Sequence, residues 1–205
     1  YDEINPDLTY SVSKYLAEQV CKTYNTLYGL DISIIRYFNV YGPHQDFKRK
    51  SPPLINYVIR ELAKNNPPTL HSNGEQKRDY IFVDDVNELN ELCMLHKKAS
   101  GEIFNACSGE SFSVNEIYSI ISDILNTTIK AKFNPSSKFW QKYENLEKGL
   151  KFPESRIEKE VNKFSLGSNS KAKELLEWQP KTSMTEGLSK CISYIQQKIS
   201  EDSNE

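Results

Sequence analysis

The stretch YSVSKYLAEQVCKTYNTLYGLDISIIRYFNVYGPHQ, residues 10–45, decides the fold class. Its first part carries apolar residues at helical spacing and is followed by Gly29, a residue type that commonly ends helices, so it predicts one long helix over residues 10–28. The next part, DISIIRYF (residues 31–38), is rich in β-branched residues and almost continuously apolar. That composition is typical of a strand that is buried on both faces of a parallel sheet. A helix followed by such a strand is the repeating unit of an α/β protein.

The rest of the chain continues this alternation. Apolar periodicity predicts helices over residues 54–64, 113–126 and 183–199. Capping boxes at Ser113–Glu116 and Ser183–Glu186 mark the starts of the helices over 113–126 and 183–199. A further helix is predicted at Asp84 and Asp85, because acidic residues suit a helix N-terminus. Short strands are predicted at TLH (69–71, before a turn at Asn73-Gly74), at the start of RDYIFV (78–83) and in GEIFNACSG (101–109). Residues 134–169 are polar and poorly patterned, so we expect an irregular excursion with one or two helical turns. The sum predicts a mainly parallel α/β protein.

Charge and composition exclude several classes of protein. The formal net charge of −2, with acids and bases interspersed, provides no basic field for a nucleic acid. No run approaches the ~18 apolar residues of a membrane span, and there is no signal segment, so a soluble, cytoplasmic protein that binds neither nucleic acid nor membrane is expected. The four cysteines are scattered among apolar neighbours and the three histidines lie far apart, which predicts reduced thiols and no metal site.

Tyr10 and Lys14 form the first candidate catalytic pair. On a helix, residues four apart face the same side, and a neighbouring ammonium favours the phenolate form of a tyrosine. Such a tyrosine can take a proton from a sugar hydroxyl while a hydride leaves the same carbon. However, the same spacing recurs at Tyr194 and Lys198, and with twelve tyrosines in the chain about one copy is expected by chance. The motif by itself therefore leaves two ordinary surface residues as an alternative.

The context of the first copy resolves this ambiguity. Residues 10–45 resemble the active-site helix and following strand of extended short-chain dehydrogenase/reductases, specifically the nucleotide-sugar epimerase and dehydratase family. The resemblance continues through GEQKRDYIFVDDV (74–86), GEIFNACSG (101–109) and NSKAKELLEWQPKTSMTEGL (169–188), in the family's order and spacing.

The resemblance also implies the architecture. It corresponds to the C-terminal part of a Rossmann-type parallel sheet plus a smaller α/β substrate-binding domain. Residues 1–47 would be the active-site helix and strand of the Rossmann domain, and residues 80–108 a return to it. Residues 48–79 and 109–205 would form the substrate domain.

The family's functional residues transfer to matching positions. Tyr10 would be the catalytic acid or base, and Lys14 would hydrogen-bond the nicotinamide ribose of NAD. Phe38 matches a position that touches the nicotinamide, although a core residue at a strand end is an equal alternative. Asn39 matches a contact to the substrate diphosphate, and the C-terminal end of a parallel strand is where ligands of open α/β sheets collect.

Three basic residues complete the predicted substrate site. Arg78 matches an arginine that clamps the diphosphate, a task that suits the guanidinium fork. Arg156 falls where the family places a second phosphate-binding arginine, but its surroundings, RIEKEV, depart from the usual R-P-G-D, so a solvated loop charge is an equal alternative. His71 lies where the family passes the nucleotide base, with a strand-surface histidine as the plainer interpretation.

Part of the family's machinery is not found in this sequence. Among the eight glycines none forms even a G-x-G or G-x-x-G, the pattern that binds NAD pyrophosphate. Only nine residues precede Tyr10, too few to include the upstream Ser or Thr of the family, and the chain begins at Tyr1 without Met. We therefore expect a C-terminal portion that lacks the NAD-binding half and that binds NAD poorly and has no turnover alone.

The leading functional hypothesis is an NAD-dependent sugar-nucleotide epimerase, with a UDP-hexose as the substrate. It would oxidise the C4 hydroxyl to a ketone and return the hydride to the other face. A 4,6-dehydratase, a heptose-nucleotide epimerase and a non-catalytic module for sugar-nucleotide binding or dimerisation remain alternatives. The family resemblance also implies a homodimer that pairs through the helix at Tyr10.

Overall fold

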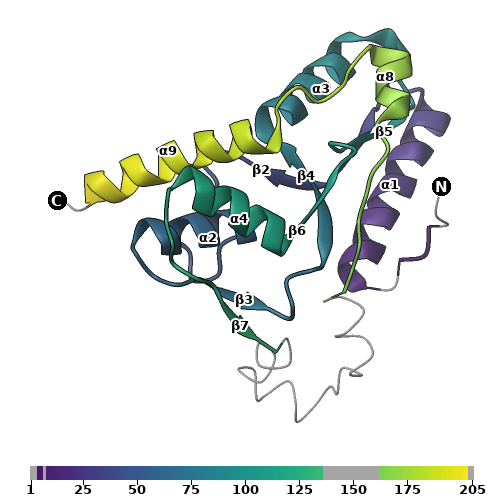
Figure 1. Cartoon of the computed structure of the whole chain (residues 1–205). Helices are drawn as coiled ribbons and strands as arrows, with labels where there is room; N and C mark the ends of the chain where they lie inside the picture. The colour runs from purple at the N-terminus through teal and green to yellow at the C-terminus, as the bar shows by residue number, and fades with distance from the viewer. Residues whose placement is uncertain (1–3, 7, 136–161, 203–205) are drawn as a thin grey trace.

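The computed structural model describes residues 4–6, 8–135 and 162–202 (Figure 1). Its helices are α1 (Thr9–Tyr28), α2 (Leu54–Ala63), α3 (Val83–Leu95), the 3-10 turn η1 (Lys97–Ala99), α4 (Val114–Ile124), α8 (Ser170–Leu176) and α9 (Met184–Asp202). Its strands are β1 (Ile34–Tyr37), β2 (Asn39–Tyr41), β3 (Thr69–His71), β4 (Lys77–Phe82), β5 (Ile103–Ala106), β6 (Ser111–Ser113) and β7 (Lys132–Asn134). Over these described ranges, no helix has the length and apolar character needed to cross a membrane.

The strand pairings confirm the predicted α/β class. β1 pairs in parallel with β5, β2 with β4, and β3 with β7, whereas β6 is antiparallel to β4. β6 and β7, each three residues long, were not predicted from the sequence. Most of the excursion predicted over residues 134–169, namely 136–161, lies outside the described residues, and 162–169 are irregular.

Helix α1 ends as the sequence predicts. Gly29 adopts φ 64° and its N–H donates to the Asn25 carbonyl at 3.0 Å, the left-handed cap that a glycine accepts without steric cost. The helix begins one residue earlier than expected, at Thr9, and Leu8 at the N-cap provides no side-chain hydrogen bond. The position of α1 therefore depends on what its side chains contact.

The strand predicted over residues 31–38 is shorter in the structure, where it is β1 (Ile34–Tyr37), and an unpredicted strand, β2, follows it. The Phe38 N–H closes the β1 ladder by donating to the Ala106 carbonyl at 3.0 Å, and Asn39 then begins a new ladder opposite Tyr80. The expectation that this segment is buried on both faces is wrong for the described chain, since Tyr37 is 55% exposed. Within the described ranges β1 has one strand neighbour, β5.

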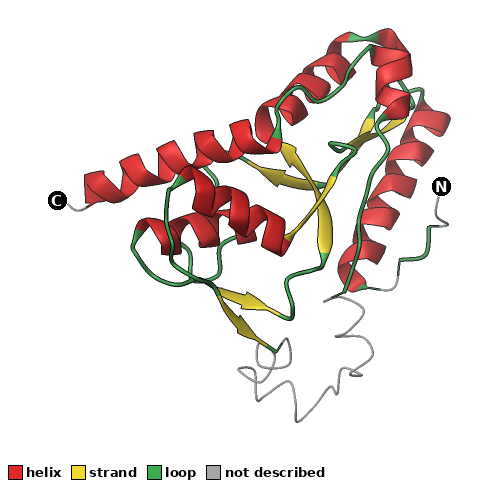
Figure 2. Cartoon of the chain, in the orientation of Figure 1, coloured by secondary structure: helices red, strands yellow, loops and turns green. Residues whose placement is uncertain are grey.

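Two hydrophobic cores form on the two sides of β4. Neighbouring side chains of a strand point to opposite faces, and accordingly Ile81 packs against α3, α8 and β5 while Phe82 packs against α2, α4 and α9. Trp178, fully buried in the first of these cores, donates its indole N–H to the Asp85 carbonyl at 3.2 Å. Figure 2 shows the two groups of helices on either side of the central strands. The division into two domains with boundaries at 47, 79 and 108 stays a prediction.

The capping boxes differ in outcome. At α4 both reciprocal bonds form, because the Glu116 N–H donates to Ser113 Oγ at 3.0 Å and the Ser113 N–H donates to the Glu116 carboxylate at 2.6 Å. At α9 the Glu186 N–H donates to Ser183 Oγ at 3.2 Å, but the Glu186 carboxylate pairs with Lys190 at 2.9 Å instead of returning to the cap. The capping pattern therefore predicted both helix starts, but at α9 the ion pair with Lys190 replaces the return bond from the Glu186 carboxylate to the cap.

A buried carboxylate fixes the loops around β4. Asp79 is fully buried, and its Oδ1 accepts from the backbone N–H and the hydroxyl of Ser108, both at 2.8 Å. Its Oδ2 accepts from the N–H groups of Gly109 and Gly167 at 3.1 and 3.0 Å. The segment 165–169 is tied further, since the Ser165 N–H donates to the Lys77 carbonyl at 3.1 Å. One side chain thus joins β4, the loop after β5 and a segment almost ninety residues away.

We expect the isosteric change Asp79→Asn to destabilise the full chain by about 3 kcal/mol. The new amide NH₂ would face N–H donors, leaving at least one buried donor without an acceptor and removing charge-assisted hydrogen bonds. Urea unfolding followed by circular dichroism at neutral pH measures this loss. Asp123→Asn, on an exposed position of α4, is the matched control and should leave the midpoint unchanged; equal midpoints for both variants would contradict the role assigned to Asp79.

Candidate active site

A groove of ≈ 980 Å³ runs between α1 and β1. α1 lies beside β5 and the chain segment leading into α8 (Figure 1). The groove is lined from α1 by Tyr10, Lys14 and Glu18, and from β1 by Ile35, Arg36 and Tyr37. Residues four apart on the helix therefore face the strand along one side of the groove.

Tyr10 and Lys14 share this groove as the spacing predicts. The Lys14 ammonium lies 5.5 Å from the centre of the Tyr10 ring, within the range of a cation–π contact. Tyr10 is 70% exposed, so its hydroxyl is open to a ligand in the groove. The Ser13 hydroxyl donates to the Tyr10 carbonyl at 2.7 Å within the first turn of the helix. The geometry of a catalytic pair is present, and the roles of the two residues stay predictions.

Glu18 extends the same row of side chains. Its carboxylate is 7% exposed and forms a two-pronged pair with Arg36, Nε to Oε2 and Nη2 to Oε1, both at 2.8 Å. Lys22 adds an ion pair at 3.1 Å. The hydrogen bond from Arg36 is the main reason that the pKa of Glu18 lies below its ordinary value; burial opposes this, and Lys22 supports it. The sequence interpretation did not single out this pair.

Phe38 lies at the crossing from β1 to β2 and is half-buried. Gly167 approaches it so closely that a Cβ there would be 2.7 Å from Phe38 Cζ and 2.6 Å from Cys107 Sγ. Cys107 is fully buried, and burial is the main cause that raises its pKa to about 12. The ring of Phe38 thus has a packing role against segment 165–169, whatever else it contacts.

Asn39 and Arg78 are brought to neighbouring strands. Asn39 Nδ2 donates to the Asp79 carbonyl at 2.7 Å, so its side chain lies across β4 next to Arg78. Arg78 Nη1 donates to the Lys77 carbonyl at 3.0 Å. Asn39 begins β2 opposite Tyr80, two residues after Arg78 in β4, although 39 positions separate Asn39 and Arg78 in the chain.

The other two predicted substrate residues are not brought to this place. His71 lies on β3, opposite Asn134 of β7, in a sheet separate from those of β1 and β4. Arg156 lies outside the described residues. Their assignments as contacts of the base and the phosphate stay predictions.

Two acidic residues were missed as organising residues of the site, Glu18 and Asp79. A signal for them exists in the sequence, because each lies among apolar residues close to a basic residue, Lys14 or Lys22 for Glu18 and Arg78 for Asp79. A buried carboxylate needs donors, but the donors Ser108, Gly109 and Gly167 are remote in sequence.

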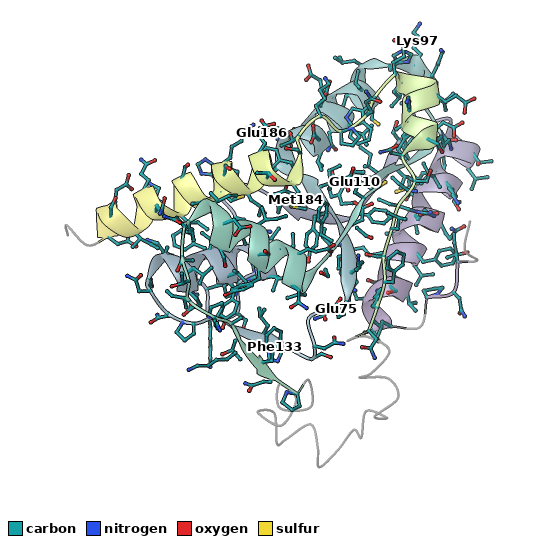
Figure 3. The ribbon with its side chains drawn as sticks, in the orientation of Figure 1. Glu75, Lys97, Glu110, Phe133, Met184 and Glu186 are labelled. Atoms are coloured by element: carbon teal, nitrogen blue, oxygen red, sulfur yellow. The ribbon has the colours of Figure 1, made fainter. Side chains whose placement is uncertain are left out.

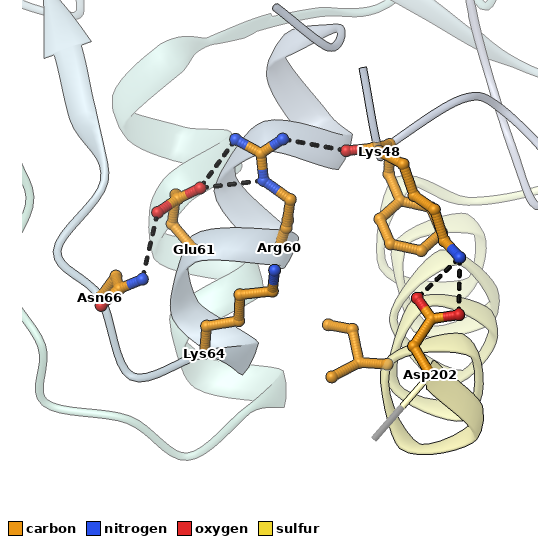
Figure 4. A pocket seen from close by; sticks show the side chains of 8 residues that line it. Lys48, Arg60, Glu61, Lys64, Asn66 and Asp202 are labelled. Carbon is orange, nitrogen blue, oxygen red and sulfur yellow. Dashed lines mark hydrogen bonds and ion pairs between the residues drawn. The ribbon is translucent and has the colours of Figure 1, made fainter. Parts of the chain in front are cut away.

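A second hollow, of ≈ 470 Å³, lies between α2 and the end of α9 (Figure 4). Its charges pair among themselves: Arg60 Nη2 with Glu61 at 2.8 Å and Lys48 with Asp202 at 2.6 Å. Lys64 also faces this space. Because most of its donors are already matched by acids and by backbone carbonyls, this hollow has less to offer an anion than the groove at Tyr10.

Comparison with known proteins agrees with the groove's chemistry. Residues 2–191 match the model of a protein family described as GDP-mannose 4,6 dehydratase. A putative UDP-glucose 4-epimerase from Methanocaldococcus jannaschii is 32% identical over 94% of this chain and 54% of its own. A UDP-glucuronate 4-epimerase from Thermodesulfobacterium geofontis is 29% identical over 93% and 51%. The chain spans about half the length of these relatives.

Solved structures of UDP-sugar 4-epimerases also resemble this chain. The UDP-glucose 4-epimerase of Thermotoga maritima with UDP-glucose superposes with a TM-score of 0.76 at 27% identity, over 93% of this chain and 54% of that one. The UDP-glucuronic acid 4-epimerase of Bacillus cereus with UDP-glucuronic acid and NAD gives 0.71 at 26%, over 97% and 57%. These likenesses confirm the predicted fold class, part of a Rossmann-type parallel sheet with further α/β structure.

The Glu18–Arg36 pair predicts a specific dependence of stability on pH. Because the pKa of Glu18 is lower in the folded chain than in the unfolded chain, its stabilising contribution is present above the unfolded value, about 4.3, and is lost as the pH falls through the folded value. We expect urea midpoints of wild type and Glu18→Gln to differ at neutral pH and to converge at acid pH. Glu91→Gln, at an exposed site on α3, is the control and should follow wild type throughout; a gap for Glu18→Gln that stays constant with pH would contradict the pair's contribution.

Proposed function

Because the chain belongs to the GDP-mannose 4,6-dehydratase family of NAD-dependent nucleotide-sugar epimerases and dehydratases, we propose that it carries the catalytic pair and substrate side of a sugar-nucleotide 4-epimerase. The proposed substrate is a UDP-hexose, and the proposed location is the cytoplasm. The relatives named above are all 4-epimerases of UDP-sugars, which supports this choice within the family.

The observation that carries the proposal is the placement of Tyr10 and Lys14. They lie 5.5 Å apart, ammonium to ring centre, in a groove large enough for the reacting sugar and the nicotinamide end of a dinucleotide. The chance copy of the motif lacks such a setting: Tyr194 packs on His44 and Phe47, and Lys198 pairs with Glu201 at 2.6 Å. The two tyrosine–lysine pairs have the same spacing and differ in their surroundings in the fold.

In the proposed reaction, NAD supplies a hydride acceptor for the carbon that bears the reacting hydroxyl. Tyr10 accepts the hydroxyl proton as the alcohol becomes a ketone and returns it when the alcohol reforms. Lys14 stabilises the negative charge on Tyr10 during that transfer. Asn39 and Arg78 hold the substrate diphosphate, so that the sugar reaches into the groove while the charged part of the substrate stays at the start of β2 and β4.

The fit to NAD is one-sided. Tyr10 and Lys14 suit the nicotinamide ribose, and Phe38 is proposed to approach the ring, but the sequence contains no glycine turn for the pyrophosphate. We propose that the activity belongs to a protein that also provides this turn, and that these 205 residues alone bind NAD weakly and do not turn over. Arg156 and His71 are proposed contacts of the second phosphate and the base.

A 4,6-dehydratase is the second candidate. A relative from Dictyostelium discoideum with that name, dTDP-D-glucose 4,6-dehydratase, is 29% identical over 62% of this chain. Both reactions begin with the same oxidation at Tyr10, so the groove is compatible with either. The product distinguishes them, since only the dehydratase eliminates water.

The outer side of α1 supports a proposed homodimer. Its apolar residues are spaced four, four, four and three apart and lie on the side of the helix away from the groove; they are Val12, Leu16, Val20, Tyr24 and Leu27, each 38–68% exposed. A contiguous exposed apolar stripe is typical of an interaction surface. We propose that a second copy of the chain covers it.

We expect Tyr10→Phe in the full-length protein to lower kcat by about 100- to 10,000-fold with little change in affinity for the sugar nucleotide, because only the proton-transferring hydroxyl is removed. Conversion of UDP-glucose to its 4-epimer measures this. Tyr194→Phe is the matched control, because Tyr194 packs through its ring, and should keep wild-type activity. A Tyr10→Phe enzyme as fast as wild type would refute the proposed function.

For the dimer, the double change Leu16→Asp and Val20→Asp should convert the full-length protein to a monomer, because charges at two adjacent stripe positions would be buried without partners. Light scattering coupled to size-exclusion chromatography reads the mass. Met94→Asp, at a 79% exposed apolar residue of α3, is the control and should stay dimeric. If the double variant remains a dimer, the proposed interface on α1 is wrong.

A further inference from the structure

The attachment of α1 to the rest of the chain is polar. Of the residues of α1, all of which the structure describes, Glu18 is the one whose side chain is buried. The large apolar residues of its outer stripe are exposed, so they do not hold the helix against β1. The helix that carries Tyr10 and Lys14 is therefore fastened to the sheet at a charged side chain in its middle.

The partner of Glu18 is fixed in turn. Arg36 lies inside β1, where it is aligned with Asn105 of β5 in the parallel ladder. The two parallel hydrogen bonds from its guanidinium, both 2.8 Å, define a plane as well as a distance. Apolar contacts have no preferred direction and would let α1 slide or rotate over β1. Two parallel hydrogen bonds are directional and restrict both the rotation of α1 about its axis and its shift along the strand.

The other contacts of α1 are less directional. Tyr15 and Cys21 are half-buried, and Asn25 donates to the Leu30 carbonyl at 2.7 Å just beyond the end of the helix. The hydrogen bond at Asn25 holds the C-terminal turn to its own loop and does not orient the N-terminal half. Lys22 pairs with Glu18 from the same helix at 3.1 Å and adds no link to the strand.

We infer that Glu18 and Arg36 are positioning residues of the reaction: their forked pair sets how α1 lies over β1 and thereby places the Tyr10 hydroxyl and the Lys14 ammonium against the strand end at Phe38 and Asn39. Tyr10, Lys14 and Glu18 are spaced four apart and face the same side. Glu18 is about 12 Å along the helix axis from Tyr10, so it acts through the rigid helix and not by contact with substrate. This inference rests on the proposed function of Tyr10.

A positioning role predicts a selective kinetic effect. Asn39 and Arg78 are held by β2 and β4, and Asn39 bonds to the Asp79 carbonyl, so the proposed diphosphate contacts do not depend on the angle of α1. Misplacement of the proton acceptor by about 1 Å lowers the chemical rate by up to ~100-fold. Loss of the pair should therefore lower kcat and leave KM for the sugar nucleotide almost unchanged.

The experiment uses full-length protein with UDP-glucose and NAD. Glu18→Gln and Arg36→Lys both keep the size of the side chain while removing the fork, and each should lower kcat by about 10- to 100-fold with KM within about twofold of wild type. Glu186→Gln is the matched control: it breaks an ion pair of 2.9 Å with Lys190 in the first turn of α9, away from α1 (Figure 3). Rates are expressed per folded enzyme, determined by circular dichroism, so that unfolding is not read as a rate effect.

A double-mutant cycle separates positioning from general support. If Glu18 acts through Tyr10, Glu18→Gln should cost much less in a Tyr10→Phe enzyme than in wild type, because the group it places is already gone. An equal fold-loss in both backgrounds, or a kcat for Glu18→Gln and Arg36→Lys within about twofold of wild type, would overturn the inference. Failure of Tyr10→Phe to lower the rate would instead refute the proposed function, so the two failures are distinguishable.

Discussion

The carboxylate of Asp79 is the interaction on which the arrangement around the site depends. It lies within β4 without any exposure to solvent, and four donors from three residues converge on it. An ionised group buried in this way is tolerated only where hydrogen bonds replace water, so the loops that supply Ser108, Gly109 and Gly167 have to come to β4. Because Asn39 in turn bonds to the Asp79 carbonyl, the position of this proposed substrate residue follows from the same strand.

A second polar link, Glu18 to Arg36, joins the helix of the proposed catalytic pair to β1. The two links differ in surroundings. Asp79 accepts hydrogen bonds from backbone and hydroxyl donors inside the fold. Glu18 pairs with a guanidinium at the edge of an open groove, where Arg36 is 41% exposed. Both attach chain segments that apolar packing alone leaves loosely placed. The hydrophobic cores around Ile81 and Phe82 stabilise the body of the molecule, while these carboxylates bond to the segments that carry the proposed site residues.

Much of the fold was legible in the sequence where local physics decides it. The helix at Tyr10, its end at Gly29 and the capping box at Ser113 depend on residues within a few positions of one another, and each is found where predicted. A strand was correctly predicted within residues 31–38, but the change of strand partner after Phe38 was not foreseen. Tyr37 is opposite Ala106 while Asn39 is opposite Tyr80, and the pattern of apolar residues carries no information about partners so distant.

By itself, the sequence determined the α/β class, the family and the face shared by Tyr10 and Lys14, since helical periodicity and motif order depend on neighbours along the chain. Only the tertiary structure decided which copy of the tyrosine–lysine spacing lies in a groove and which packs against His44. It also put Asn39 and Arg78 on paired strands, left His71 on another sheet and gave the two carboxylates their hydrogen-bond partners. The physical reason is that a buried charge is stabilised by whatever donors the fold brings to it, and those donors come from segments between 18 and 88 positions away.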